Sequence, residues 1–418
     1  MYGKFGRDVV WNAVAVGILA VAGLLISLVI GRFYGSSALG VFNQTFAFYT
    51  IVAQLAAGGM HYSVLRHAAE HSADRSVCAR IVSSSLGLAA VSAALVSCAS
   101  ALLRRPIGIA LNSPDTATSL LYVVPGVFFF ALNKVLMNYL NALRQMRAFA
   151  VFQVMRYVCM AVFLVVFILL RFPGPAAAGI LSCAEILLFL ALVSFVSRRT
   201  RLLWPSQWMG WGRISCRFGL HALPGGVLTD LNTRIEVLVL GMFASDSVVG
   251  VYSLAAMFMQ GVSQLGHVLM VNVNPIISRL FFSGRRKELV EQMRRGIRLA
   301  YIAIGGGAAA AVIVYPLIVR AFLGRTDFAE SWALFGIQAG GIIIAAGYLP
   351  LMMLPTQTGR PELYALLLLA IGCSKIILSL ALIPPLGMYG AAAAAALSFS
   401  LSALYLRILA KRSLGVAV

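Results

Sequence analysis

The chain has 418 residues, of which 61% are hydrophobic and 11% charged, whereas soluble globular proteins average about 45–50% and about 25%. This composition excludes a soluble protein and predicts one that crosses a membrane many times. The 33 Lys and Arg residues outnumber the 13 Asp and Glu residues, which gives a net charge of +20. In a soluble protein such a surplus would suggest nucleic-acid binding, but in a membrane protein basic residues collect in cytoplasmic loops.

Twelve apolar stretches are long enough to cross the hydrocarbon core, which takes about 20 residues of helix. In chain order we predict spans at Val10–Ile30, Phe42–Met60, Ile81–Leu103, Leu120–Leu140, Phe149–Leu170, Ala176–Val196, Phe218–Leu240, Val249–Val271, Leu299–Leu323, Trp332–Leu354, Leu363–Ile383 and Met388–Ala410. The connections are too short for a folded soluble domain. The first stretch is longer than a signal-peptide core and no convincing small-residue cleavage site follows it, so we interpret it as a span.

The basic residues are distributed unevenly between the two sides of the predicted membrane. With the N-terminus in the cytoplasm, 23 of the 33 fall on the inner side and six on the outer side. This asymmetry predicts that both termini are cytoplasmic. It also argues against nucleic-acid binding, because the basic residues lie on short loops separated by spans. The remaining four, Lys134, Arg156, Arg234 and Lys375, lie at membrane depth.

The inner connection before the ninth span contains apolar residues at helical spacing, namely Leu289, Met293 and Ile297. We predict a short helix there, which either lies on the inner surface or extends the span into water. The six cysteines include no C-x-x-C pair, and His67 and His71 stand four residues apart without further ligands nearby. We therefore predict no metal site and no disulfide framework.

A segment near the start of the chain is repeated half a chain length later. Leu28–Phe42 aligns with Leu238–Tyr252 at an offset of 210 residues, with seven identities in fifteen positions. Six spans in each half would give both halves the same orientation in the membrane. The sequence therefore predicts an all-helical protein of two parallel six-helix bundles, residues 1–205 and 206–418, with a central cavity as the natural substrate site.

Three segments resemble one transporter family: Gly31-RFYGSSALGVF, Asn232-TRIEVLVLGMFASDSVVGVYSLA and Gly387-MYGAAAAAALS. They are similar to polysaccharide transporters of the O-antigen flippase (Wzx-like) type, within the multidrug/oligosaccharidyl-lipid/polysaccharide (MOP) exporter superfamily. The resemblance covers essentially the whole chain, but its glycine and apolar patterns are loose.

The resemblance implies a flippase in the bacterial cytoplasmic (inner) membrane. It would move polyprenyl-diphosphate-linked oligosaccharide to the outer leaflet by alternating access, for O-antigen or exopolysaccharide synthesis. It implies no cofactor beyond a coupling ion, H⁺ or Na⁺, and partners such as a polysaccharide polymerase and a chain-length protein. A multidrug or cation antiporter of the same superfamily and a lipid II flippase stay open as alternatives. An enzyme is disfavoured, because the outer connections are short and carry no paired carboxylates.

Charges inside spans cost at least about 2.5–3.5 kcal/mol each on insertion scales, so they indicate function. We predict a cationic cavity in which the four basic residues at membrane depth bind a diphosphate, the arginines as forked donors and the lysines as compact charges. Three carboxylates accompany them and would balance charge or bind a coupling proton: Glu185, Asp230 and Glu236.

Each of these charges also has a purely structural interpretation. Asp230 and Arg234 stand four residues apart on one helix and would neutralise each other. Arg156 is near the inner end of its span, from which it can reach the surface. Glu185 would pair with Lys134 or Lys375.

A proline and two glycines interrupt the predicted seventh span just before its charged residues. Pro224, Gly225 and Gly226 predict a hinge, because a helix that lines a cavity can bend there without exposing backbone groups to lipid. The alternative is a static kink or a close helix contact.

Overall fold

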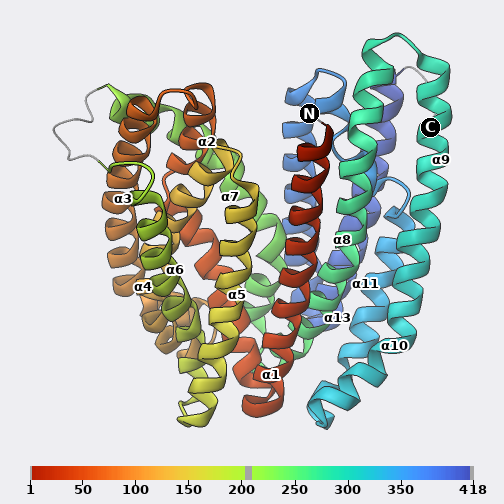
Figure 1. The fold of residues 1–418 in the computed structure, drawn as a ribbon. Coiled ribbons are helices and arrows are strands. Elements are labelled where there is room, and N and C mark those ends of the chain that lie inside the picture. Colours follow the sequence, from red (N-terminus) through yellow and green to blue (C-terminus); the bar gives the residue numbers. More distant parts are fainter. Residues whose placement is uncertain (1, 203–209, 415–418) are drawn as a thin grey trace. The chain divides into compact units, whose positions relative to one another are not determined.

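The structure, a computed structural model, describes residues 2–202 and 210–414, and these residues form helices and turns without a strand. They divide into two compact units (Figure 1). Unit 1 comprises Met1–Tyr34 and Val41–Leu231, and unit 2 comprises Gly35–Gly40 and Asn232–Val418. The predicted boundary between residues 205 and 206 lies outside the described residues, so the division at that point stays a prediction.

Unit 1 is a bundle in which α4 packs against α2, α3 and α6. Its helices, the last of which continues into unit 2, are α1 (Tyr2–Ala56), α2 (Met60–Glu70), α3 (Arg75–Ala110), α4 (Pro114–Ala142), α5 (Met146–Leu169), the 3₁₀ turn η1 (Gly174–Ala178), α6 (Gly179–Ser197) and α7 (Trp211–Phe243).

Unit 2 is a second bundle, in which α11 packs against α8, α10 and α13. Its helices are α8 (Asp246–Phe282), α9 (Arg286–Ala300), the π-helical turn η3 (Tyr301–Gly305), α10 (Gly306–Leu323), the 3₁₀ turns η4 (Thr326–Phe328) and η5 (Leu349–Leu351), α11 (Ser331–Ala345), α12 (Leu354–Gln357) and α13 (Pro361–Leu414).

The described residues contain nine helices that are long and apolar enough to cross a membrane. Two of them, Gly17–Ala56 and Pro361–Lys411, each cover two of the predicted spans, Gly17–Ala56 only in part. The predicted seventh span lies in α7, which is not among the nine because charged residues interrupt its apolar sequence. The prediction of an all-helical protein with about twelve transmembrane helices is confirmed.

The predicted outer connection between the first two spans, residues 31–41, is very short. Two helices meet within it at Gly35, whose φ of 88° and ψ of 179° are not helical, so the chain changes direction at this residue. An equivalent break occurs at Gly387 (φ 55°) inside α13. Glycine tolerates a positive φ at little cost, so one residue can turn the chain where a loop was expected.

One further prediction about unit 2 needs correction, and one pair of open alternatives is decided. The predicted span Trp332–Leu354 is interrupted, because α11 ends at Ala345 and short helical turns follow it. The basic helix α9 runs through η3 into α10 without a break, so it extends a span instead of lying separately on the membrane surface. Its Leu289 and Met293 are buried in an apolar cluster of unit 2, which explains their helical spacing.

Side-chain caps set where two helices of unit 1 begin. The Asp74 carboxylate accepts hydrogen bonds from the backbone N–H groups of Ser76 (2.8 Å) and Val77 (3.1 Å) at the start of α3. The Ser113 hydroxyl accepts one from Thr116 N (3.0 Å) at the start of α4, with Pro114 next to it in the first turn. Both caps satisfy backbone donors that would otherwise have no helical partner.

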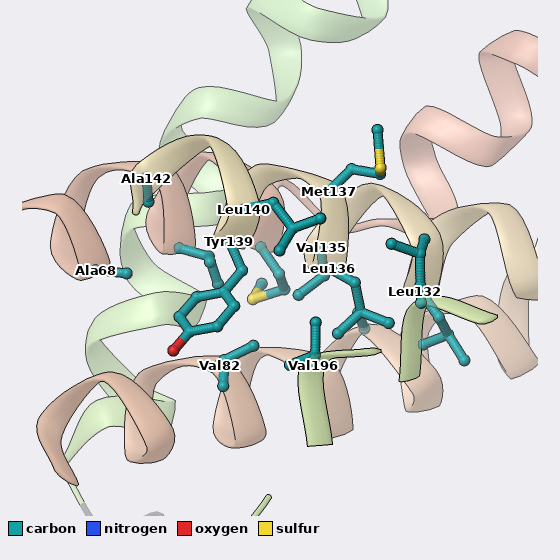
Figure 2. Close-up of a cluster of buried hydrophobic side chains, with 14 of the residues drawn as sticks. Ala68, Val82, Leu132, Val135, Leu136, Met137, Tyr139, Leu140, Ala142 and Val196 are labelled. Carbon is teal, nitrogen blue, oxygen red and sulfur yellow. The ribbon is translucent and has the colours of Figure 1, made fainter. Parts of the chain in front are cut away.

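The apolar core of unit 1 lies where α4 meets α3 and α6. Figure 2 shows Leu136, Tyr139 and Leu140 of α4 next to Val82 of α3 and Val196 of α6. All five side chains are 3% exposed or less. This packing makes α4 the central helix of the unit and a rigid support for the polar residues that it carries.

The repeated segments contact each other at corresponding residues within unit 2. A Cβ atom on Gly40 would lie 1.8 Å from the Asp246 carbonyl oxygen, and one on Gly250 would lie 1.9 Å from the Ser36 carbonyl oxygen. The two contacts are equivalent by the repeat, because Gly40 corresponds to Gly250 and Ser36 corresponds to Asp246 at the offset of 210. The hydroxyls of Ser36 and Ser247 add a hydrogen bond of 2.7 Å. The two identical glycines therefore let the backbones of α1 and α8 meet closely.

Candidate functional site

A buried ion pair joins two neighbouring helices of unit 1. Arg156 on α5 places its Nε 2.7 Å from Oε1 of Glu185 on α6. The two side chains are 20% and 3% exposed, so water screens the pair weakly. The arginine turns toward α6 instead of extending to the membrane surface. Glu185 thus pairs with an arginine, and the predicted pairing with a lysine is not what the structure shows.

Asn133 of α4 binds the same carboxylate. Its Nδ2 donates to Oε2 of Glu185 (2.7 Å) and also to the Glu185 backbone carbonyl (2.9 Å). Asn133 is fully buried. Glu185 therefore connects α4, α5 and α6, and its charge is compensated by one cation and one amide donor.

One turn earlier, α6 also contacts the part of α4 that contains a proline. Pro125 lies inside α4, and the hydroxyl of Ser182 lies between two backbone groups that a regular helix would pair directly. Gly126 N donates to Ser182 Oγ (2.8 Å), which donates to the Tyr122 carbonyl (2.5 Å). A serine from a neighbouring helix is a common way to satisfy backbone groups freed by proline in a membrane.

Lys134 follows Asn133 on α4 and has a different environment. Its ammonium donates to the Oε1 of Gln54, a buried amide on α1, and lies 5.5 Å from the ring centroid of Phe130. The same ring receives the Arg156 guanidinium at 4.8 Å. The Asp230 carboxylate is near enough to act on Lys134 electrostatically. An ammonium has three donors, and since Gln54 accepts from one, two can serve an anionic group.

Unit 2 contains a second buried ion pair. Lys375 of α13 places its Nζ 2.7 Å from Oε1 of Glu236 on α7, and also donates to the Asn232 carbonyl at 2.5 Å. The side chains of Lys375 and Glu236 are 17% and 7% exposed. Gly372 allows this contact, because a Cβ there would lie 2.5 Å from Oδ1 of Asn232. Lys375 lacks an acidic partner on its own helix and takes one from α7.

The seven predicted charged residues thus fall into groups with different surroundings. Arg156 with Glu185 and Lys375 with Glu236 form neutral pairs, one in each unit. Lys134 has an amide and a ring as its contacts. Asp230 and Arg234 on α7 are half-buried and lie in units 1 and 2, respectively. A substrate-binding role for any of them stays a prediction.

The predicted hinge lies in a helix that continues through its proline. α7 remains helical from Trp211 to Phe243 with Pro224 inside it. A Cβ on Gly225 would meet nothing within 4 Å, whereas one on Gly226 would lie 1.8 Å from Nε2 of Gln54. Close packing therefore explains the glycine at position 226, because any side chain there would collide with the Gln54 amide that binds Lys134. Bending at this position stays a prediction.

Sequence reasoning missed the uncharged residues described above, four of them in unit 1 and the last in unit 2: Gln54, Phe130, Asn133, Ser182 and Asn232. Amide side chains are uncommon inside apolar helices because their desolvation costs free energy unless they are hydrogen-bonded. Gln54 and Asn133 each interrupt a predicted span, so listing every polar residue within the spans would have found them. Phe130 gave no such signal among the many aromatic residues of the spans.

Comparison of the sequence with protein families identifies one match. The profile of the polysaccharide biosynthesis protein family matches residues 5–281, about two thirds of the chain. No curated protein sequence matches the chain.

Solved structures share the fold at low sequence identity. The lipid II flippase MurJ in an inward closed conformation has a TM-score of 0.76 at 13% identity, with 96% of this chain and 87% of that chain covered. An inward-facing multidrug transporter of the MATE family has a TM-score of 0.72 at 14% identity, with 98% of each chain covered. A MOP superfamily transporter from Pyrococcus furiosus, described as having a binding pocket of reverse polarity, has a TM-score of 0.59 at 13% identity, with 99% and 95% covered.

These likenesses place the fold among the MOP exporters, and the family match goes further because it rests on the sequence itself. The chain belongs to the polysaccharide biosynthesis protein family, and it is a multi-pass membrane protein with the fold of the MOP exporters.

Proposed function

We propose that the protein is a flippase for polyprenyl-diphosphate-linked oligosaccharide. It would carry this lipid from the cytoplasmic to the outer leaflet of a bacterial cytoplasmic membrane by alternating access, for O-antigen or exopolysaccharide synthesis. The family match supports a role in polysaccharide synthesis. The excess of basic residues in the inner connections supports a topology with both termini in the cytoplasm.

The observation that carries the proposal is the environment of Lys134. Its ammonium contacts an amide oxygen and an aromatic ring, and the Asp230 carboxylate acts on it electrostatically; we infer that its remaining donors bind an anion. A diphosphate offers several charged oxygens, and hydrogen bonds between charged partners are about twice as strong as neutral ones. A buried cation that bound no anion would raise the free energy of the folded protein in the membrane, since each charge within a span costs about 2.5–3.5 kcal/mol or more.

The buried carboxylates argue against the second candidate, an exporter of cationic drugs. Such a substrate needs negative charge to replace its lost hydration. Glu185 is paired with Arg156 and Glu236 with Lys375, so each carboxylate is already neutralised inside its own unit. We therefore assign Glu185 and Glu236 a charge-balancing role and not that of cation ligands.

The test is a substitution of Lys134 in the parent bacterium, after deletion of the gene and complementation. K134A is expected to lower surface polysaccharide at least tenfold at unchanged protein level, because a charged hydrogen bond contributes about 1.5–3 kcal/mol. Lipid-linked repeat units should accumulate in the inner leaflet. K134R keeps the charge and should retain part of the activity.

The matched control is K287A, which removes a lysine from the exposed end of α9 and should leave transport unchanged. Normal surface glycan in the deletion strain, with an altered tolerance to cationic drugs, would instead establish the drug-exporter function. Full activity of K134A would remove Lys134 from the site.

A further inference from the structure

A basic pocket lies at one end of unit 1, between the start of α3 and the end of α6. Its volume is about 580 Å³, and four arginines contribute to its lining: Arg75, Arg80, Arg199 and Arg201. Ser76, Ala79 and Thr200 complete it. Neither the family match nor the charges at membrane depth account for this pocket.

Two buried residues of the lining connect the pocket to the apolar core of unit 1. Thr200 is 7% exposed, and its hydroxyl is hydrogen-bonded to that of Tyr139 at 2.8 Å. Tyr139 belongs to the apolar core that Figure 2 shows, beside Val82 and Val196. Ala79, which is 5% exposed, lines the pocket one turn before Val82. The backbone that carries the arginines is therefore fixed by the core, which reduces the entropy lost when a ligand binds.

The positive charge of the pocket is largely uncompensated. Within the described residues, none of the four arginines has a carboxylate at ion-pair distance; residues 203–209, which follow Arg201, contain no Asp or Glu. Arg199 is held instead by the Phe195 ring, 3.9 Å from its Cζ, and by the Gln145 amide oxygen at 3.4 Å. One carboxylate, Asp74, is close enough to act on Arg80 electrostatically, and it also accepts the capping hydrogen bonds of α3.

The helix that ends at the pocket presents an apolar side chain outward. Leu190 on α6, two turns before the end of that helix, is 56% exposed. In spans, such side chains contact the hydrocarbon core of the membrane. The arginines therefore lie where apolar helix surface gives way to the water-facing end of the bundle, which is the depth of lipid head groups.

We propose that this pocket binds the phosphate head group of an anionic phospholipid from the adjacent leaflet. Guanidinium groups bind phosphate through paired N–H donors, and basic pockets between transmembrane helices suit anionic head groups. The acyl chains would lie along the apolar surface of α6. The inference depends on the proposed function in one respect only, since the proposed topology makes this leaflet the cytoplasmic one.

The experiment measures lipid binding to the purified full-length protein by native mass spectrometry. Phosphatidylglycerol is expected to remain bound under conditions that remove phosphatidylcholine. The double substitution R80Q/R201Q should weaken phosphatidylglycerol binding about thirty-fold, because each basic residue near an anionic surface contributes about five-fold. R80K/R201K keeps the charge and should lose less, which also distinguishes a lost site from a misfolded protein.

The matched control is R286Q/R298Q, which removes the same charge from exposed positions on α9. Equal weakening by both double substitutions would show diffuse attraction to a basic surface and would overturn the proposal. Displacement of the lipid by millimolar inorganic phosphate would also overturn it, because the ligand would then be a soluble phosphate. Transport can fail in K134A while lipid binding persists, so the two proposals are tested separately.

Discussion

Replacing Glu185 with alanine is expected to destabilise the protein by about 3–5 kcal/mol, because Arg156 would remain buried without its counter-charge. Glu185 is 2% exposed, and its carboxylate also accepts a hydrogen bond from Asn133. The substitution therefore removes contacts to two helices together. The measurements are the amount of folded protein in the membrane and the midpoint of thermal unfolding in detergent, both of which should fall sharply.

A series of further variants separates charge from hydrogen bonding. E185Q keeps an oxygen for Asn133 but removes the charge, and it should also be unstable. The double variant R156Q/E185Q removes both charges and should recover most of the lost stability, since deletion of a whole buried pair is often close to neutral. If the double variant folds but does not transport, the pair also acts in transport.

The exposed pair between Arg295 and Glu291 provides the matched control. Its side chains are 64% and 61% exposed, so E291A should leave the unfolding midpoint unchanged. If E185A were as stable as E291A, the pair with Arg156 would contribute no net stability and our structural account of it would be wrong.

The sequence predicted which charges lie in the membrane, but it did not predict their partners. Hydropathy places Arg156, Glu185 and Lys375 within apolar stretches, because one charge in about twenty apolar residues is easily recognised. Pairing depends on helix rotation and on which helices are neighbours. Neither can be read from span boundaries, so the Arg156–Glu185 and Lys375–Glu236 pairs became visible only in the folded chain.

Span boundaries show a similar limit. The twelve stretches were recognisable from composition, whereas the turn at Gly35 was not, because a single residue with positive φ replaces a loop of several residues. Likewise, α9 is strongly charged on one face and therefore fits a surface helix. The sequence left its continuity with α10 open, and the structure shows a continuous helix with Leu289 and Met293 buried in unit 2, which is a tertiary contact.

The repeat, by contrast, was predicted from sequence, and the contact between its glycines leads to a second strong prediction. G250A is expected to destabilise the protein by about 3 kcal/mol or more, since the added Cβ would lie 1.9 Å from the Ser36 carbonyl oxygen. Backbone atoms on both sides leave no flexible side chain to move away. G40A adds a Cβ 1.8 Å from the Asp246 carbonyl oxygen and should have a similar effect.

Gly261 lies on the same helix, α8, and provides the control. A Cβ there would meet nothing within 4 Å, so G261A should stabilise the protein slightly, by about 0.5–1 kcal/mol, as alanine does in an open helical position. Thermal unfolding of the three variants in detergent makes the comparison. The double variant G40A/G250A should lose less than the sum of the two single losses, because both Cβ atoms force the same pair of backbones apart. Strictly additive losses would mean that the two glycines make independent contacts, and the repeated glycine would then need another explanation.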